Sequence, residues 1–259
     1  MAGDRGDTPP SQSERFFDAL LDRDGAGGSW LGPLLRAAPR GPDRFGELAD
    51  RPGWLEAPLA VRTETGRRGA FEYPAAPPRA LLAWFIDHPE ELRRPEQAPV
   101  SPETLRLWRA LFDDEPRGAR ARAQDRAHEL LRGSPPFAEA WWRFEEAHTA
   151  DCLLMTDRIV LLVHAREDGA APLPATPWFP RRSALVRDLE AARRFGDSGK
   201  AWGVLVLGGD DDRSADLPGE IAAGAPHLDP DSRRDLAAGY LGALTWARAA
   251  AATGLTGPS

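Results

Sequence analysis

The sequence has almost no cysteine, and that shortage excludes the small secreted scaffolds that disulfides hold together. Cys152 is the single cysteine among 259 residues, so no internal disulfide can form. It lies in an apolar stretch, where a buried structural thiol is the expected role. We therefore expect a protein of the reducing cytoplasm.

Long hydrophobic runs are also missing. Nothing approaches the roughly 18 to 20 consecutive apolar residues that a membrane-spanning helix needs. The opening stretch has neither the basic nor the apolar part of a signal peptide. We expect neither a membrane span nor a membrane partner. A G-x-S-x-G motif, a Walker loop, H-E-x-x-H and a dinucleotide fingerprint are absent too, so an unrelated hydrolase has no motif in its favour.

Lysine is nearly absent, although basic residues are plentiful. Of the 33 basic residues only Lys200 is a lysine, so 32 are arginines, which suggests GC-rich coding. The net charge of -7 opposes a general attraction to nucleic acid, but phosphate contacts require only a local basic face. With 42% apolar and 28% charged residues, the chain has a globular composition and should fold.

The chain divides into two tails, an N-terminal extension and a core. Residues 1–13 should be a disordered tail, 14–100 a helical and irregular extension, 101–253 the α/β core and 254–259 a frayed end. The elements predicted in the extension are helices at 13–22, 30–38 and 79–88 and a strand at 59–63.

The period of the apolar residues changes within the core. Helices are predicted first, at 101–112, 118–132 and 137–147. Two nearly continuous apolar runs, 151–155 and 158–166, then indicate a hairpin buried on both faces. A helix at 181–195, a strand at 201–207 and a last helix from 229 to about 253 follow. This order predicts an α/β core with a mixed sheet.

Three short motifs lie along this core. They are Glu145-Glu146-Ala147-His148-Thr149-Ala150-Asp151, His164-Ala165-Arg166 and Trp178-Phe179-Pro180-Arg181-Arg182. Their order, with the hairpin between the first two, resembles the PD-(D/E)XK nuclease superfamily, in particular uncharacterised bacterial members with an E-x-x-T-x-D, E-x-K and W-[YF]-P-x-R arrangement. The resemblance implies a restriction-endonuclease-like core (helix, mixed sheet with a central hairpin, helix, strand) with a helical N-terminal extension.

The resemblance also assigns a site. It implies that Asp151 and the acid of E-x-K hold Mg²⁺ or Mn²⁺ and that the lysine helps the attacking water. The candidates to compensate for a lost group are Glu145 or Glu146 of the preceding helix, Glu167 and Asp168 just beyond the strand, and Lys200. The acid position is His164 here, and the lysine position is Arg166. Imidazole suits zinc, copper, iron or nickel better than magnesium, and arginine does not readily release a proton. The coding bias explains the arginine, but not the histidine.

The hairpin register predicts how these residues meet. If Thr156 and Asp157 form a two-residue turn, Asp151 lies opposite Leu162 and His164 is its diagonal neighbour on the same face. Alternation places Arg166 on that face as well. Asp151 and His164 are therefore the candidate metal ligands. The alternatives are a hydrogen-bonded strand histidine and an ion pair between Arg166 and Asp151 in place of the metal.

A second candidate surface is the start of the helix after the hairpin. Arg181, Arg182 and Arg187 are predicted to contact nucleic-acid phosphates, although arginines interleaved with acids also form ordinary solvated surfaces. Two functions follow. One is a nuclease-like protein that binds nucleic acid, with DNA expected, and whose metal-dependent hydrolysis is weak or lost. The other is a noncatalytic protein-interaction module on a nuclease scaffold.

Overall fold

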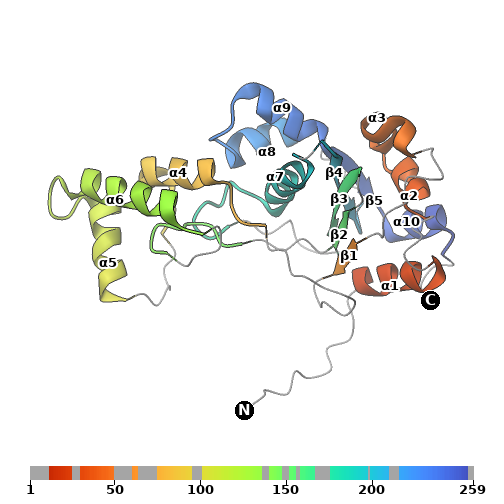
Figure 1. Ribbon diagram of the computed structural model, residues 1–259, viewed down its shortest axis with the longest axis horizontal. Helices are drawn as coiled ribbons and strands as arrows, with labels where there is room; N and C mark the ends of the chain where they lie inside the picture. Colours follow the sequence, from red (N-terminus) through yellow and green to blue (C-terminus); the bar gives the residue numbers. More distant parts are fainter. Residues whose placement is uncertain are drawn as a thin grey trace, which may run out of the picture.

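The fold is an α/β arrangement in which N-terminal helices accompany a mixed sheet, as a computed structural model shows (Figure 1). The structure describes residues 12–24, 30–49, 60–63, 75–94, 101–135, 140–147, 152–155, 158–166, 176–197, 199–209 and 216–255. None of the helices in these ranges is long and apolar enough to cross a membrane.

The sheet has five strands in the order in which they occur along the chain. They are β1 (Ala60–Thr63), β2 (Cys152–Met155), β3 (Ile159–Ala165), β4 (Ala201–Leu207) and β5 (Tyr240–Leu244). The pairs β1–β2 and β2–β3 are antiparallel, whereas β3–β4 and β4–β5 are parallel. Parallel neighbours need crossover connections, and helices supply both of them. The predicted hairpin followed by a parallel strand is confirmed.

The predicted register of the hairpin is wrong by two residues. Met155 pairs with Val160, so the connection is longer than the two-residue turn expected. Leu153 therefore lies opposite Leu162, the partner that the prediction had given to Asp151. Because side chains alternate with a period of two, a shift of two residues leaves every side chain on its predicted face.

One face of the sheet is covered by helices from both ends of the chain. These are α1 (Gln12–Asp24), α2 (Leu31–Ala37), α3 (Gly41–Phe45) and α10 (Trp246–Thr253), which lie together in Figure 1. Their apolar residues form one cluster with Cys152, Leu161 and Val163 of the hairpin. Cys152 is buried, as predicted. Each fully buried leucine or phenylalanine contributes about 1.5–3 kcal/mol.

The opposite face is covered by α7 (Ala184–Gly196), with α8 (Leu217–Gly224) and α9 (Pro230–Ala238) behind it. Helix α7 begins after Ser183, whose hydroxyl oxygen accepts a hydrogen bond from the Val186 N–H at 3.3 Å. Its Leu185 and Leu189, four residues apart, pack on Leu162 and Val204 of the sheet. This face carries the even-numbered residues of β3, including position 164.

A third hydrophobic cluster lies apart from the sheet, on the side of α7. It is formed by α4 (Arg79–Asp87), α5 (Pro102–Trp108), a π-helical segment (Arg109–Asp113) and α6 (Ala119–Gly133), and we call these elements the helical lobe (Figure 1). Helix α4, which precedes residue 100, thus packs with helices that follow it. Short 3-10 turns at Gly46–Ala49 and Pro89–Glu91 complete the described elements.

Most of the predicted elements are confirmed, but two helices are wrong. Of the helix predicted at 137–147, the described residues 140–147 form turns and irregular backbone, because Trp142 and Phe144 pack individually into the helical lobe. The helix predicted from 229 to about 253 is α9, β5 and α10. Gly242 in β5 has a φ of +98°, which no right-handed helix contains, and Tyr240 and Leu241 are buried beside β4.

Candidate functional site

The carboxyl ends of β3, β4 and β5 meet at one edge of the sheet because these strands run parallel. Ligand sites of open α/β sheets lie at such edges. His164, near the end of β3, and Asp188, in the second turn of α7, come together here. Nδ1 of His164 lies 2.8 Å from Oδ2 of Asp188. Asp188 is fully buried and His164 is 7% exposed.

A buried carboxylate needs a hydrogen-bonded partner, and His164 meets that need for Asp188. When Asp188 is ionised, Nδ1–H of the ring donates to it, and this leaves Nε2 as the ring's basic nitrogen. A carboxylate in this position also fixes the orientation of the imidazole. The pair is therefore a histidine whose ring orientation is fixed by a buried carboxylate.

Arg166 follows the last residue of β3 and is held by its backbone. Its N–H donates to the Leu207 carbonyl at 2.7 Å, and its own carbonyl accepts from Nε1 of Trp246 at 2.9 Å. Side-chain atom Nη1 would lie 3.6 Å from a Cβ added at Gly209. The guanidinium therefore extends alongside the residues that follow β4.

Asp151 lies outside the described residues, so its predicted approach to His164 stays a prediction. Among the residues that the structure describes, no group of three or more His, Cys, Asp or Glu side chains could hold a metal ion. His164 is bonded to Asp188 through Nδ1, and imidazole is a poor ligand for Mg²⁺. The described donor atoms therefore do not fit the magnesium or manganese centre that the resemblance implies.

Glu145 is well placed, but its partner is an arginine. Arg182 is 1% exposed; its Nε donates to Oε2 of Glu145 at 2.6 Å, and its Nη1 lies 2.5 Å from Oε2 of Glu190. Nη1 also donates to the Gly224 carbonyl at 3.1 Å. Burial pulls the pKa of Arg182 down, but the two carboxylates outweigh it, so the pKa is raised. The guanidinium stays charged inside the protein.

Two further residues complete what we call the Arg182 network: Glu145, Arg182, Arg187, Glu190 and His227. Nε of Arg187 donates to Oε1 of Glu145 at 3.2 Å, and burial lowers the pKa of Arg187. Nε2 of His227 lies 2.9 Å from Oε1 of Glu190. Burial alone would raise the pKa of Glu190, but Arg182 and His227 together lower it. The two carboxylates and two guanidinium groups of the network therefore balance one another's charges inside the protein.

The network limits which of the three predicted phosphate-binding arginines is accessible. Arg182 is enclosed, so its guanidinium is not accessible to a nucleic-acid phosphate. Arg187 has a side chain that is 16% exposed and is already bonded to Glu145 and to the Glu146 carbonyl. Arg181 is half exposed and forms an ion pair with Glu91. Arg181 and Arg182 differ in exposure because the side chains of consecutive residues point in different directions.

The aromatic residues of the W-F-P-x-R motif pack against the helical lobe. Phe179 is fully buried, with its ring 5.3 Å from that of Phe85, and Trp178 stacks on Phe112 at 5.8 Å. Both contacts are with the helical lobe, whereas Arg182 reaches toward α7. The motif therefore joins the helical lobe to the sheet domain.

Asp188, Glu190 and His227 are the site residues that sequence reasoning missed. Asp188 and Glu190 alternate with arginines in the chain, which is typical of a solvated surface. Asp188 follows Leu185 by three residues and precedes Leu189, so it lies on the apolar stripe of α7, and that position was the available signal. His227 lies in the short loop between α8 and α9, where the sequence holds no such signal.

Comparison with known proteins adds no relative to this picture. No protein-family model, curated protein or solved structure matches the chain.

Proposed function

We propose that this chain is a nuclease-like protein of the PD-(D/E)XK fold that binds nucleic acid, with DNA as the expected form, and has lost most or all metal-dependent hydrolysis. The observation that carries this proposal is the His164–Asp188 pair. A hairpin, a crossover helix and a parallel strand surround position 164, which is the arrangement that the motif order implies. At the acid position of that arrangement stands an imidazole bonded to a buried carboxylate.

The chemistry of the two replaced positions supports the loss of hydrolysis. Magnesium prefers hard oxygen ligands, and His164 provides nitrogen in place of a carboxylate. A water molecule attacking a phosphodiester also needs a group that accepts or orients its proton. A guanidinium has N–H donors and no acceptor, so Arg166 can steady a phosphate but is not suited to take that proton. Binding would therefore persist where catalysis does not.

A cleavage assay tests the proposal. Supercoiled plasmid and single-stranded DNA are incubated with Mg²⁺ or Mn²⁺ and either the natural chain, Asp151→Ala, or the double variant His164→Glu, Arg166→Lys. We expect the natural chain and Asp151→Ala to show the same background, and the double variant to cleave at least tenfold faster, because it regains an oxygen ligand and a lysine. Cleavage by the natural chain as fast as that by the double variant, and abolished in Asp151→Ala, would contradict the proposal.

A noncatalytic protein-interaction module is the second candidate, and the Arg182 network favours it. Of the three arginines expected to contact phosphates, one is enclosed and another is bonded to Glu145. These side chains stabilise the fold, which leaves fewer guanidinium groups for DNA. Under this alternative, DNA binding would be absent or insensitive to salt.

A further inference from the structure

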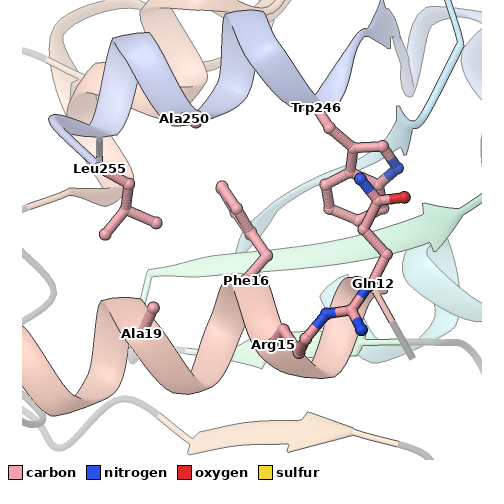
Figure 2. A pocket seen from close by; sticks show the side chains of 7 residues that line it. All are labelled: Gln12, Arg15, Phe16, Ala19, Trp246, Ala250 and Leu255. Carbon is pink, nitrogen blue, oxygen red and sulfur yellow. The ribbon is translucent and has the colours of Figure 1, made fainter. Parts of the chain in front are cut away.

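A pocket lies between α1 and α10, on the face of the sheet away from the Arg182 network (Figure 2). Its volume is about 110 Å³, and it is partly open. The residues that line it are Gln12, Arg15, Phe16, Ala19, Trp246, Ala250 and Leu255. An apolar cavity of about 150 Å³ accommodates benzene, so a partly open pocket of this size admits one ring whose substituent stays at the mouth.

The aromatic wall of the pocket is held in place from behind. The Phe16 and Trp246 ring centroids are 5.5 Å apart with planes inclined at 61°, and Phe16 also meets Phe17 edge to face at 5.2 Å. Nε1 of Trp246 donates to the Arg166 carbonyl, which fixes the indole. A ligand ring would extend this edge-to-face cluster, and little side-chain entropy would be lost because the wall is already ordered.

The polar groups of the pocket gather at one end. Gln12 and Arg15 are three residues apart on α1, so they share a helix face, and Figure 2 shows Gln12 next to the Trp246 indole. Arg15 is exposed, and within the part of the chain that the structure describes its guanidinium makes no hydrogen bond or ion pair. No lining residue is acidic. The charge at this end is therefore available to a ligand.

We infer that this pocket binds a small aromatic carboxylate, with the ring against Phe16 and Trp246 and the carboxylate on Arg15. A guanidinium binds a carboxylate through two parallel hydrogen bonds, which are stronger than neutral ones. The Gln12 amide, which Figure 2 shows next to the Trp246 indole, is a further donor in the pocket lining. A neutral ring gains the apolar contact alone, and a cationic ring meets the charge of Arg15. The order of affinity is carboxylate, then neutral ring, then cation.

Calorimetric titration of the full chain tests the inference with three probes of one size: benzoate, benzamide and benzylamine. We expect saturable binding of benzoate, at least tenfold weaker binding of benzamide, and none of benzylamine. Arg15→Gln should bring benzoate down to the benzamide level and leave benzamide unchanged. Arg234→Gln, an exposed arginine on another helix, is the matched control and should bind benzoate like the natural chain.

A filling variant tests the location. Ala19 is exposed at the pocket, so Ala19→Leu is tolerated by the fold and should abolish binding of both benzoate and benzamide. The inference is overturned if benzoate and benzamide bind equally, or if the full chain binds neither. Benzoate binding that appears only after deletion of residues 1–11 or 256–259 would mean that a terminal segment of the chain occupies the pocket. That result also overturns the inference. None of these results depends on DNA binding or cleavage.

Discussion

At the scale of single residues, the main feature is Arg182, a guanidinium enclosed by protein and balanced by Glu145 and Glu190. A buried ion pair is weak evidence for stability by itself, because desolvation of both charges offsets their attraction. Removing one partner is different, since it leaves an uncompensated charge in the interior. The network therefore makes each of its carboxylates sensitive to substitution and to protonation.

Glu190 provides a test with a defined sign. Its pKa is lowered in the folded protein, so the unfolded chain binds more protons between the two pKa values. The stabilisation from ionised Glu190 is complete above the ordinary pKa of glutamate and is lost as pH falls through the lower folded value. We expect Glu190→Gln to reduce the free energy of unfolding at pH 7 by about 3–5 kcal/mol, with a difference from the natural chain that shrinks in acid.

Urea unfolding at pH 7 and at steps below pH 5 measures this. Glu146→Gln is the matched control, because Glu146 is exposed and follows Glu145 of the network directly. It should follow the natural chain at every pH. An acid dependence for Glu190→Gln as steep as that of the natural chain would assign the effect to other carboxylates.

At the scale of elements, tight packing around Trp202 of β4 ties three helices to the sheet. A Cβ at Gly239, which follows α9, would lie 1.9 Å from Cζ3 of Trp202, and one at Gly196 of α7 would lie 2.6 Å from Cδ1. From α3, the Arg44 guanidinium lies 4.5 Å from the centre of the indole and donates to the Trp202 carbonyl at 3.1 Å. The Trp202 indole therefore fits in this position because the residues beside it, Gly196 and Gly239, have no side chain.

Gly239→Ala tests this packing without a backbone effect. The φ of Gly239 is -75°, which any residue adopts, so the change acts through the clash with Trp202 alone. We expect a loss of about 1–3 kcal/mol in the free energy of unfolding. Gly219→Ala in α8 is the control, because a Cβ there meets nothing within 4 Å, and it should be neutral or stabilising. Equal free energies of unfolding of the two variants in urea would show that the Trp202 ring can shift to accept the added Cβ, which would contradict the prediction.

At the scale of the whole molecule, two groups of elements are joined through the W-F-P-x-R motif. The sheet carries helices on both faces, and the helical lobe attaches through Trp178 and Phe179. A net charge of -7 means that the molecule as a whole does not attract DNA. DNA binding, as we propose it, must come from a few exposed arginines, and Arg181, which lies just before α7, is one of them.

Salt dependence measures that contribution. We expect DNA affinity to fall as salt rises, and Arg181→Gln to reduce the slope of log K against log salt by about 0.9, the value for one phosphate contact. Arg234→Gln, another surface arginine in an ion pair, should leave the slope unchanged. Fluorescence anisotropy with a labelled duplex at several salt concentrations provides both slopes. Binding that is absent, or equally strong at all salt concentrations, would support the interaction module instead.

The sequence by itself determined the elements whose signals are local. The hairpin strands, β4 and the helices of residues 12–37 and 79–133 follow from apolar period, capping serines and glycine breaks. It also placed His164 on the same face as Leu162, since alternation survives a register shift of two. Burial of Cys152 followed from its apolar neighbours in the same way.

Only the tertiary structure decided which partner each polar residue has. Glutamate and arginine occur both on solvated helices and in buried networks, and the local sequence is similar in the two cases. Arg182 and Glu190 are buried because Glu145, Gly224 and His227 contact them from distant segments of the chain. The strand β5 likewise forms inside a helix-like stretch because β4 offers it a partner. Long-range hydrogen bonds and ion pairs carry this information, and a one-dimensional pattern does not.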